Sequence, residues 1–154
     1  MDIERIVKPS FSVIGLAGST EDGPGFIQRL WEEANARFPE AAPLAKTGPD
    51  GALSGIWGAM SDFSLSFLPW EDGFSRGLYL AGIEAREDAQ PPEGWAKWTI
   101  PGFEYLKTES TGPDTFQRMI GWMEKEGISL AGAVHDYTDP ATGRGYMLFP
   151  VRRL

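Results

Sequence analysis

The chain has 154 residues, with 14 Lys and Arg against 22 Asp and Glu, which gives a formal net charge of −8. This length predicts one domain over residues 1–154, and the acidic balance argues against direct binding of nucleic acid through its phosphates. The sequence contains no Cys, which excludes disulfides, thiolate metal sites and a Cys nucleophile. We see no apolar run long enough to cross a membrane and no secretory signal, so we expect a cytoplasmic protein without membrane contact.

Two segments with the same local pattern begin the predicted helices. Residues 23–30 (GPGFIQRL) and 112–119 (GPDTFQRM) share Gly-Pro, Gln-Arg and a final apolar residue. Apolar residues then recur at helical spacing over 24–38 and 113–126, which predicts one amphipathic helix in each segment. Pro is well suited to the first turn of a helix, and Pro39 and Gly127 are typical stop signals.

Further blocks recur in the same order around these helices, which indicates an internal duplication. Residues 9–11 resemble 101–103, residues 53–56 resemble 130–133, and residues 76–83 resemble 144–151. Together with the helices, the extended stretches give the order strand, helix, strand, strand twice. These stretches are 11–17, 53–60 and 76–86 in the first half and 103–107, 129–137 and 145–152 in the second. A further strand is expected at 95–100.

The duplication predicts the fold class. We expect an α+β fold in which an antiparallel sheet carries the two main helices on one face. Repeat one covers about residues 1–88 and repeat two about residues 95–154. Neither repeat is large enough to form a stable core alone, and a ligand groove is expected between the two.

Few residues carry recognisable chemistry. The phosphate-loop and dinucleotide-binding fingerprints are missing, and His135 is the only His, so we predict no cofactor and no metal site. Glu84 follows the apolar run 78–83, where it could select a cation or polarise a water, or else pair with Arg86 in solvent. His135 could be a polar group of a pocket wall, or a partly buried residue that bonds a neighbour.

The chain is rich in aromatic residues, with 6 Trp, 4 Tyr and 9 Phe. Rings around a cavity can sandwich a flat ligand or hold a cation against their faces. We expect the following residues to line one groove between the repeats: Trp57, Trp70, Tyr79, Glu84, Phe103, Tyr105, His135 and Tyr137.

A family resemblance is carried by segments spread over the whole chain: 80–84 (LAGIE), 92–95 (PEGW), 99–105 (TIPGFEY), 111–113 (TGP), 121–123 (GWM), 135–137 (HDY) and 149–151 (FPV). In these segments the chain resembles the GyrI-like proteins, the effector-binding domains of AraC-type and MerR-type multidrug-sensing regulators. The resemblance implies a duplicated fold with an aromatic-lined pocket for drug-like ligands, which are often flat and cationic. In some members a similar cage hydrolyses strained cyclopropane-containing DNA-alkylating agents.

Two departures from the family pattern matter. The drug-sensing members carry a Glu two residues before the Tyr of the strand that follows the second helix, and His135 stands at that position here. A negative charge would then have to come from Glu84 or Glu104. The chain also begins at the pocket domain with no helix-turn-helix before it, so we expect no direct contact with DNA.

The leading hypothesis is a stand-alone small-molecule-binding protein for hydrophobic, aromatic or cationic xenobiotics. The alternative is a hydrolase of strained cyclopropane-containing electrophiles, in which Glu84 activates a water and Tyr105 or His135 donates a proton. A third reading is a regulator of a partner protein. A cavity with an acid in reach of the ligand favours the enzyme, a cavity without one favours the binder, and an exposed apolar patch over a filled core favours the partner.

Overall fold

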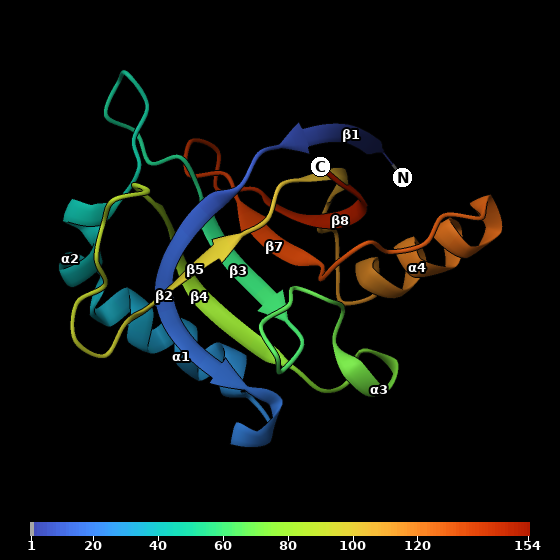
Figure 1. The fold of residues 1–154 in the computed structure, drawn as a ribbon, viewed down its shortest axis with the longest axis horizontal. Helices are drawn as coiled ribbons and strands as arrows, with labels where there is room; N and C mark the ends of the chain where they lie inside the picture. Colours follow the sequence, from blue (N-terminus) through green and yellow to red (C-terminus); the bar gives the residue numbers. More distant parts are fainter. Residues whose placement is uncertain (1) are drawn as a thin grey trace.

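The computed structural model describes residues 2–154. Its centre is an eight-stranded antiparallel sheet with the order β1-β6-β8-β7-β3-β4-β2-β5 (Figure 1). The strands are β1 (Ile3–Lys8), β2 (Phe11–Ser19), β3 (Ile56–Ser61), β4 (Leu78–Ala85), β5 (Ala96–Ile100), β6 (Phe103–Glu109), β7 (His135–Thr138) and β8 (Gly145–Arg153). The helices are α1 (Phe26–Ala36), α2 (Phe38–Ala41), α3 (Glu71–Phe74) and α4 (Thr115–Glu126), with 3₁₀ turns at Thr20–Asp22 and Ala42–Leu44.

The sheet has the symmetry that a duplication predicts. The pairing of β3 with β7 joins two halves, and the strand order read inward from either edge places equivalent strands at equivalent positions. Each main helix begins three residues after the Gly of its Gly-Pro pair, α1 at Phe26 after Gly23 and α4 at Thr115 after Gly112. The predicted α+β fold with an antiparallel sheet is confirmed.

The edge strands are exchanged between the halves. β1 precedes the first repeat in the chain but pairs with β6, and β5 precedes the second repeat but pairs with β2. Only two residues link β1 to β2, and only two link β5 to β6. These links touch, because a Cβ added to Gly102 would lie 3.2 Å from the Ser10 nitrogen. Since such short links join strands from opposite ends of the sheet, the sheet must curl until its ends meet. The sequence patterns predicted β5 but not β1.

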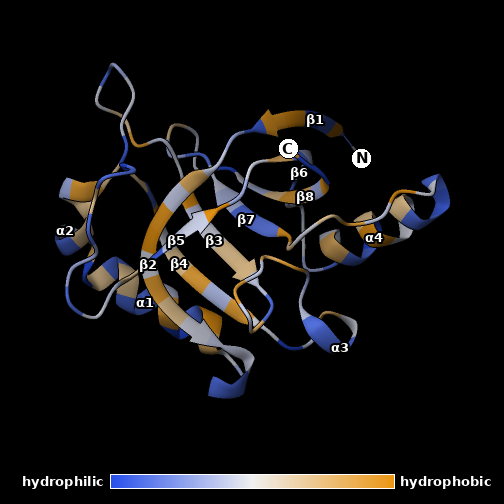
Figure 2. Cartoon of the chain, viewed as in Figure 1, coloured by the Kyte–Doolittle hydropathy of each residue, from blue (hydrophilic) through white to orange (hydrophobic). Residues whose placement is uncertain are grey.

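The sheet has two faces with different covers. On the helix face, Phe26 of α1 packs against β2 and β4, and Met119 and Met123 of α4 pack against β6 and β8. On the opposite face, the curl of the sheet encloses a cluster that includes Trp57 and Phe103. Figure 2 shows hydrophobic residues concentrated in β2, β3 and β4, while α3 and the end of α4 are hydrophilic.

Candidate ligand sites

The structure divides the eight predicted groove residues between the two faces. Six lie on the opposite face: Trp57, Glu84, Phe103, Tyr105, His135 and Tyr137. Trp70 and Tyr79 belong to the cluster on the helix face. The expectation of one shared groove therefore does not hold for these two residues. Alternation along β4 explains Tyr79, because Tyr79 and Leu80 must point to different sides of the sheet.

Trp57 is the centre of the opposite-face site. It pairs with Tyr137 across the β3–β7 junction, and the two ring centroids lie 4.8 Å apart. Phe11 lies against Trp57 with a centroid distance of 4.7 Å, and the His135 ring meets it edge-on at 6.4 Å. The rings that surround Trp57 therefore come from both repeats, as the expected groove between repeats requires.

Glu84 is buried beside Trp57, and its carboxylate is paired with two lysine side chains of the chain. Its side chain is only 3% exposed, and it accepts a hydrogen bond of 3.2 Å from the indole Nε1 of Trp57. The Lys8 ammonium lies 3.2 Å from one Glu84 oxygen, and the Lys46 ammonium lies 3.8 Å from the other. A buried carboxylate needs such partners. Glu84 thus has its counter-ions within the chain, and it is not a free acid for a ligand.

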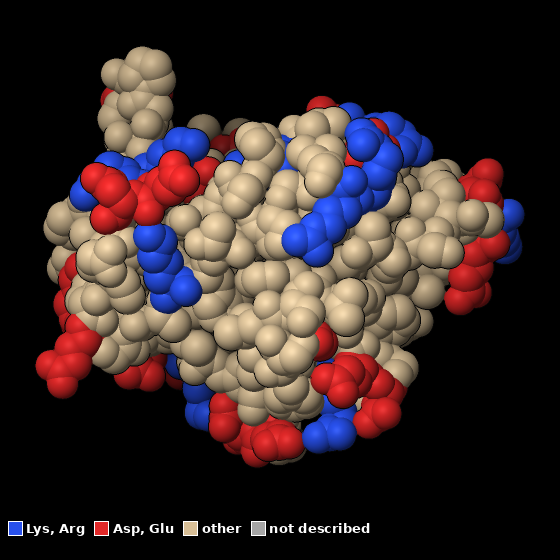
Figure 3. Space-filling view, viewed as in Figure 1, with Lys and Arg blue, Asp and Glu red and all other residues tan. Residues whose placement is uncertain are grey.

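Lysine side chains also occupy the aromatic faces of this site. Lys8 Nζ lies 4.4 Å from the Phe11 ring centroid, and Lys107 Nζ lies 4.4 Å from that of Tyr146 and 5.3 Å from that of Tyr137. Figure 3 shows Lys and Arg side chains gathered over β1 and β8, with acidic groups near α3 and at the end of α4. The lysines enclose a cavity of about 150 Å³ whose lining residues are Ile6, Lys8, Ser54, Trp57, Glu84, Lys107, Tyr137 and Leu148.

The two lysines were missed by the sequence analysis for different reasons. Lys107 could have been found, because strict alternation from Phe103 and Tyr105 places it on the same face. Lys8 lies on β1, which the patterns did not predict and which reaches the site only through the strand exchange.

His135 and Tyr105 leave two buried polar atoms without a partner. The Met60 amide donates to His135 Nδ1 at 3.1 Å, and burial lowers the pKa of His135 to about 3, so the ring is neutral and carries its proton on Nε2. That Nε2 and the Tyr105 hydroxyl have no hydrogen-bond partner among residues 2–154. Burial also raises the pKa of the Tyr105 hydroxyl. Tyr105 does not contact Glu84 by a hydrogen bond, so the expected catalytic pair is not assembled.

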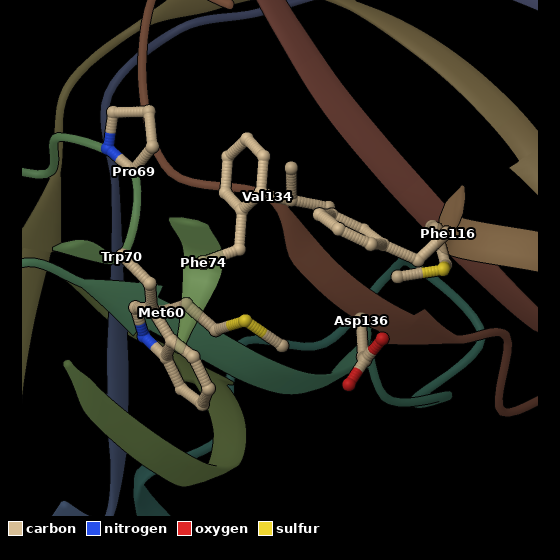
Figure 4. A pocket seen from close by; sticks show the side chains of 8 residues that line it. Met60, Pro69, Trp70, Phe74, Phe116, Val134 and Asp136 are labelled. Carbon is tan, nitrogen blue, oxygen red and sulfur yellow. The ribbon is translucent and has the colours of Figure 1, made fainter. Parts of the chain in front are cut away.

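A second cavity lies on the helix face, over the same β3–β7 junction. Its volume is about 230 Å³. Figure 4 shows side chains from β3, the segment before β4, helix α4, and β7 with the residue before it, and Asp136 is the one charged group among the lining residues. Met147 of β8 completes the lining. The lining residues are Met60, Pro69, Trp70, Phe74, Phe116, Val134, Asp136 and Met147.

Asp136 is held by a chain of hydrogen bonds across three strands. The Trp31 indole donates to the Tyr79 hydroxyl at 3.0 Å, and that hydroxyl donates to Asp136 Oδ2 at 3.2 Å. Tyr79 reaches over β3 at Gly58, where a Cβ would lie only 1.9 Å from the hydroxyl oxygen. Burial raises the pKa of Asp136 to about 6, although the Tyr79 hydrogen bond lowers it. Asp136 was not predicted as a site residue, although alternation along β7 points its side chain to the face opposite to those of His135 and Tyr137.

The described residues lack two further kinds of feature. Within residues 2–154, no three His, Asp or Glu side chains come together as a group that could hold a metal ion. None of the helices in this part of the chain is long and apolar enough to cross a membrane.

Comparison with known proteins gives structural matches alone. No family model and no curated protein sequence matches the chain. Among solved structures, SAV2435 bound to tetraphenylphosphonium is similar with a TM-score of 0.64 at 16% identity, over 99% of this chain and 94% of that one. The C-terminal domain of EcmrR is similar with a TM-score of 0.64 at 13% identity, over 99% and 98%. The chain has a GyrI-like fold.

A third structure with the GyrI-like fold is a hydrolase from Listeria innocua, with a TM-score of 0.54 at 16% identity over 97% of this chain and 91% of that one. At these identities the likeness establishes the fold and leaves the ligand to be argued from the residues of the two cavities.

Proposed function

We propose that this protein binds small aromatic molecules at the opposite-face site around Trp57. The observation that carries the proposal is the pairing of Trp57 with Tyr137 across the repeat junction, at the cavity of about 150 Å³. Aromatic faces of this kind favour flat, hydrophobic ligands. The tetraphenylphosphonium bound by SAV2435 supports small-molecule binding as a use of the same fold.

The charges of the site narrow the ligand class. The ring faces that could hold a cation already contact Lys8 and Lys107, and a second cation there would be repelled. The ammonium groups of Lys8 and Lys107 line the cavity itself, where they can pair with an anionic group of a ligand. These groups favour an aromatic ligand that carries a carboxylate or another acceptor over a cationic one.

The hydrolase alternative has less support from this geometry. Water activation needs a carboxylate that is free to accept a proton. Glu84 accepts from Trp57 and is paired with two lysines, and neither Tyr105 nor His135 bonds to it. Binding without chemistry is therefore the function that the site supports best.

A matched ligand series tests the proposal. Calorimetric titration with 2-naphthoate, 2-naphthalenemethanol and 2-naphthylmethyl-trimethylammonium separates the contribution of charge from that of the ring. We expect the carboxylate to bind most tightly. Trp57→Ala should weaken its binding at least tenfold, or about 1.4 kcal/mol. Unchanged affinity in a folded Trp57→Ala protein would place the site elsewhere.

A pair of lysine variants checks the charge argument. Lys107→Gln removes an ammonium from the site, whereas Lys125→Gln removes one from the exposed end of α4. The first should reduce the preference for the carboxylate over the alcohol severalfold, and the second should leave that preference unchanged. Equal effects of the two variants would show that only the net charge of the protein matters.

A further inference from the structure

The cavity on the helix face is separate from the site around Trp57. The two share the β3–β7 junction but lie on opposite sides of the sheet, since Trp57 and Met60 point to different faces and so do Tyr137 and Asp136. Seven of the eight lining residues are apolar, and they include the rings of Trp70, Phe74 and Phe116. An apolar pocket with a single well-placed polar group is the usual form of a small-molecule site.

The charge in this cavity has the opposite sign to that of the Trp57 site. Asp136 forms no ion pair with any Lys, Arg or His of residues 2–154, and no basic residue lines the cavity. Tyr79 donates to Oδ2 alone, which leaves Oδ1 without a donor among the described residues. Here a carboxylate faces apolar walls with no counter-ion in the described part of the chain, whereas Glu84 on the other face has two.

The walls offer surfaces that suit an organic cation. Aromatic faces attract an ammonium through the ring quadrupole, and thioethers adapt to irregular apolar shapes. Phe74 and Phe116 meet edge to face with centroids 5.2 Å apart, and Met60 and Met147 supply two thioethers. Within residues 2–154 no lysine lies over these rings, in contrast to the rings of the opposite face.

The backbone of the wall is held in an uncommon conformation. Asp72 and Phe74 both have positive φ, at 51° and 66°, in the short segment that brings the Phe74 ring to the cavity. Such conformations cost of order 1 kcal/mol or more each and cluster at ligand-binding sites. The segment thus places an aromatic ring at the cavity in spite of an unfavourable backbone conformation.

We infer that this cavity is a second ligand site, which binds a small organic cation with an apolar body, a quaternary or protonated amine, against the carboxylate of Asp136. The cation takes the place of the missing counter-ion, and the aromatic and thioether walls cover its apolar part. Because the site uses a different face and different residues, it stands independently of ligand binding at Trp57.

The test uses a charged ligand and its uncharged isostere on the full chain. Benzyltrimethylammonium and neopentylbenzene have the same shape and differ by one positive charge. Proton–carbon NMR of methionine methyl groups reports the location, because Met60 and Met147 line the cavity, whereas Met119 and Met123 of α4 are buried against the sheet. We expect saturable shifts of Met60 and Met147, and at least tenfold tighter binding of the cation than of the isostere.

Asp136→Asn is the decisive variant, because it keeps the shape of the side chain and removes its charge. It should weaken binding of the cation at least tenfold and abolish the preference over neopentylbenzene. Glu126→Gln makes the same change of net charge at an exposed position of α4 and should leave both affinities unchanged. Binding of 2-naphthoate should survive Asp136→Asn, so a failure of one site is distinguishable from a failure of the other.

Three results would each overturn the inference. They are the absence of saturable shifts with benzyltrimethylammonium at millimolar concentration, shifts that appear at Met119 and Met123 instead, and cation affinity that Asp136→Asn leaves intact. If Asp136→Asn protein shows altered backbone shifts far from the cavity, Phe116→Leu supplies a second variant. It should weaken binding of both ligands, because it removes an aromatic wall and keeps the carboxylate.

Discussion

His135, Asp136 and Tyr137 show how far one strand can separate adjacent side chains. His135 and Tyr137 surround Trp57 on one face, and Asp136 closes the cavity on the other. Burial acts on the two ionisable neighbours in opposite ways, because it disfavours the charged form of each. It lowers the pKa of His135 to about 3 and raises that of Asp136 to about 6.

These two shifts predict opposing effects of pH on stability. For Asp136 the folded pKa is raised, so its contribution to stability is lost as the pH rises from about 4 to about 6. For His135 the folded pKa is lowered, so stability is lost as the pH falls from about 6.5 toward 3. Between about pH 4 and pH 6 the two groups change the free energy of unfolding in opposite directions, and these changes nearly cancel in the wild-type protein.

Asp136→Asn should remove the contribution of Asp136 to the pH dependence of stability and leave that of His135. At pH 7.5 the variant should have a free energy of unfolding about 1–3 kcal/mol higher than the wild type, because the raised pKa marks a cost of the charged form. The gain should shrink steadily below pH 6 and disappear near pH 3, where the wild-type carboxyl is mainly protonated in both states. Urea unfolding at several pH values measures both. An equal gain at pH 3 and pH 7.5 would show that the charge of Asp136 is not its cause.

At the scale of elements, the segment between β3 and β4 serves both faces. Phe67 packs in the opposite-face cluster, and Trp70 packs on the helix face with its indole donating to the Leu78 carbonyl. Asp62 organises the start of this segment, where it accepts from two hydroxyls and two backbone amides. The amides belong to Ser66 and Leu68, and the hydroxyls to Ser61 and Ser64. The segment thus lines the helix-face cavity and also contributes a side chain to the opposite-face cluster.

Asp62→Ala should destabilise the protein by about 2–4 kcal/mol, because buried donors lose their acceptor. Burial alone would raise the pKa of Asp62, but the hydrogen bonds from Ser64 and Ser61 and from the two amides lower it overall, which indicates that they favour the carboxylate. Thermal unfolding measures the loss, and Asp88→Ala at an exposed position is the control. A loss no larger than that of the control would remove Asp62 from this role.

At the scale of the whole molecule, the exchange of β1 and β5 makes each half depend on the other. β6 has β1 of the first repeat as its outer neighbour, and β2 has β5 of the second. The two short links that touch at Gly102 tie the ends of the curled sheet together. A half without its exchanged strand would leave a long unpaired edge, which is unfavourable for a soluble protein.

Separate fragments should therefore not fold. We expect residues 1–90 and 91–154, each expressed alone, to lack a cooperative unfolding transition, and an equimolar mixture to recover the circular dichroism of the intact chain. A chain nicked at position 90 after folding serves as the control. Cooperative unfolding of the isolated second fragment as a monomer would contradict the dependence on β1.

The sequence alone determined the parts of this protein that depend on neighbours along the chain. The Gly-Pro helix starts, the helical periodicity after them and the alternation in the strands are local, so the duplicated α+β fold could be predicted from them. The contact at the centre of the proposed aromatic site was also accessible, because Trp57 and Tyr137 lie on equivalent strands, β3 and β7.

Only the tertiary structure decided which face each side chain serves and which charges meet there. Lys8 reaches Glu84 because β1 crosses to the other half. The two residues are 76 positions apart in the sequence. Asp136 could be placed in the helix-face cavity only from the pairing of β3 with β7, with Tyr79 lying across Gly58 of β3. Strand exchange and sheet curl are set by contacts between distant segments, and those contacts leave no periodic signal in the sequence. The charge of each cavity therefore follows from the fold.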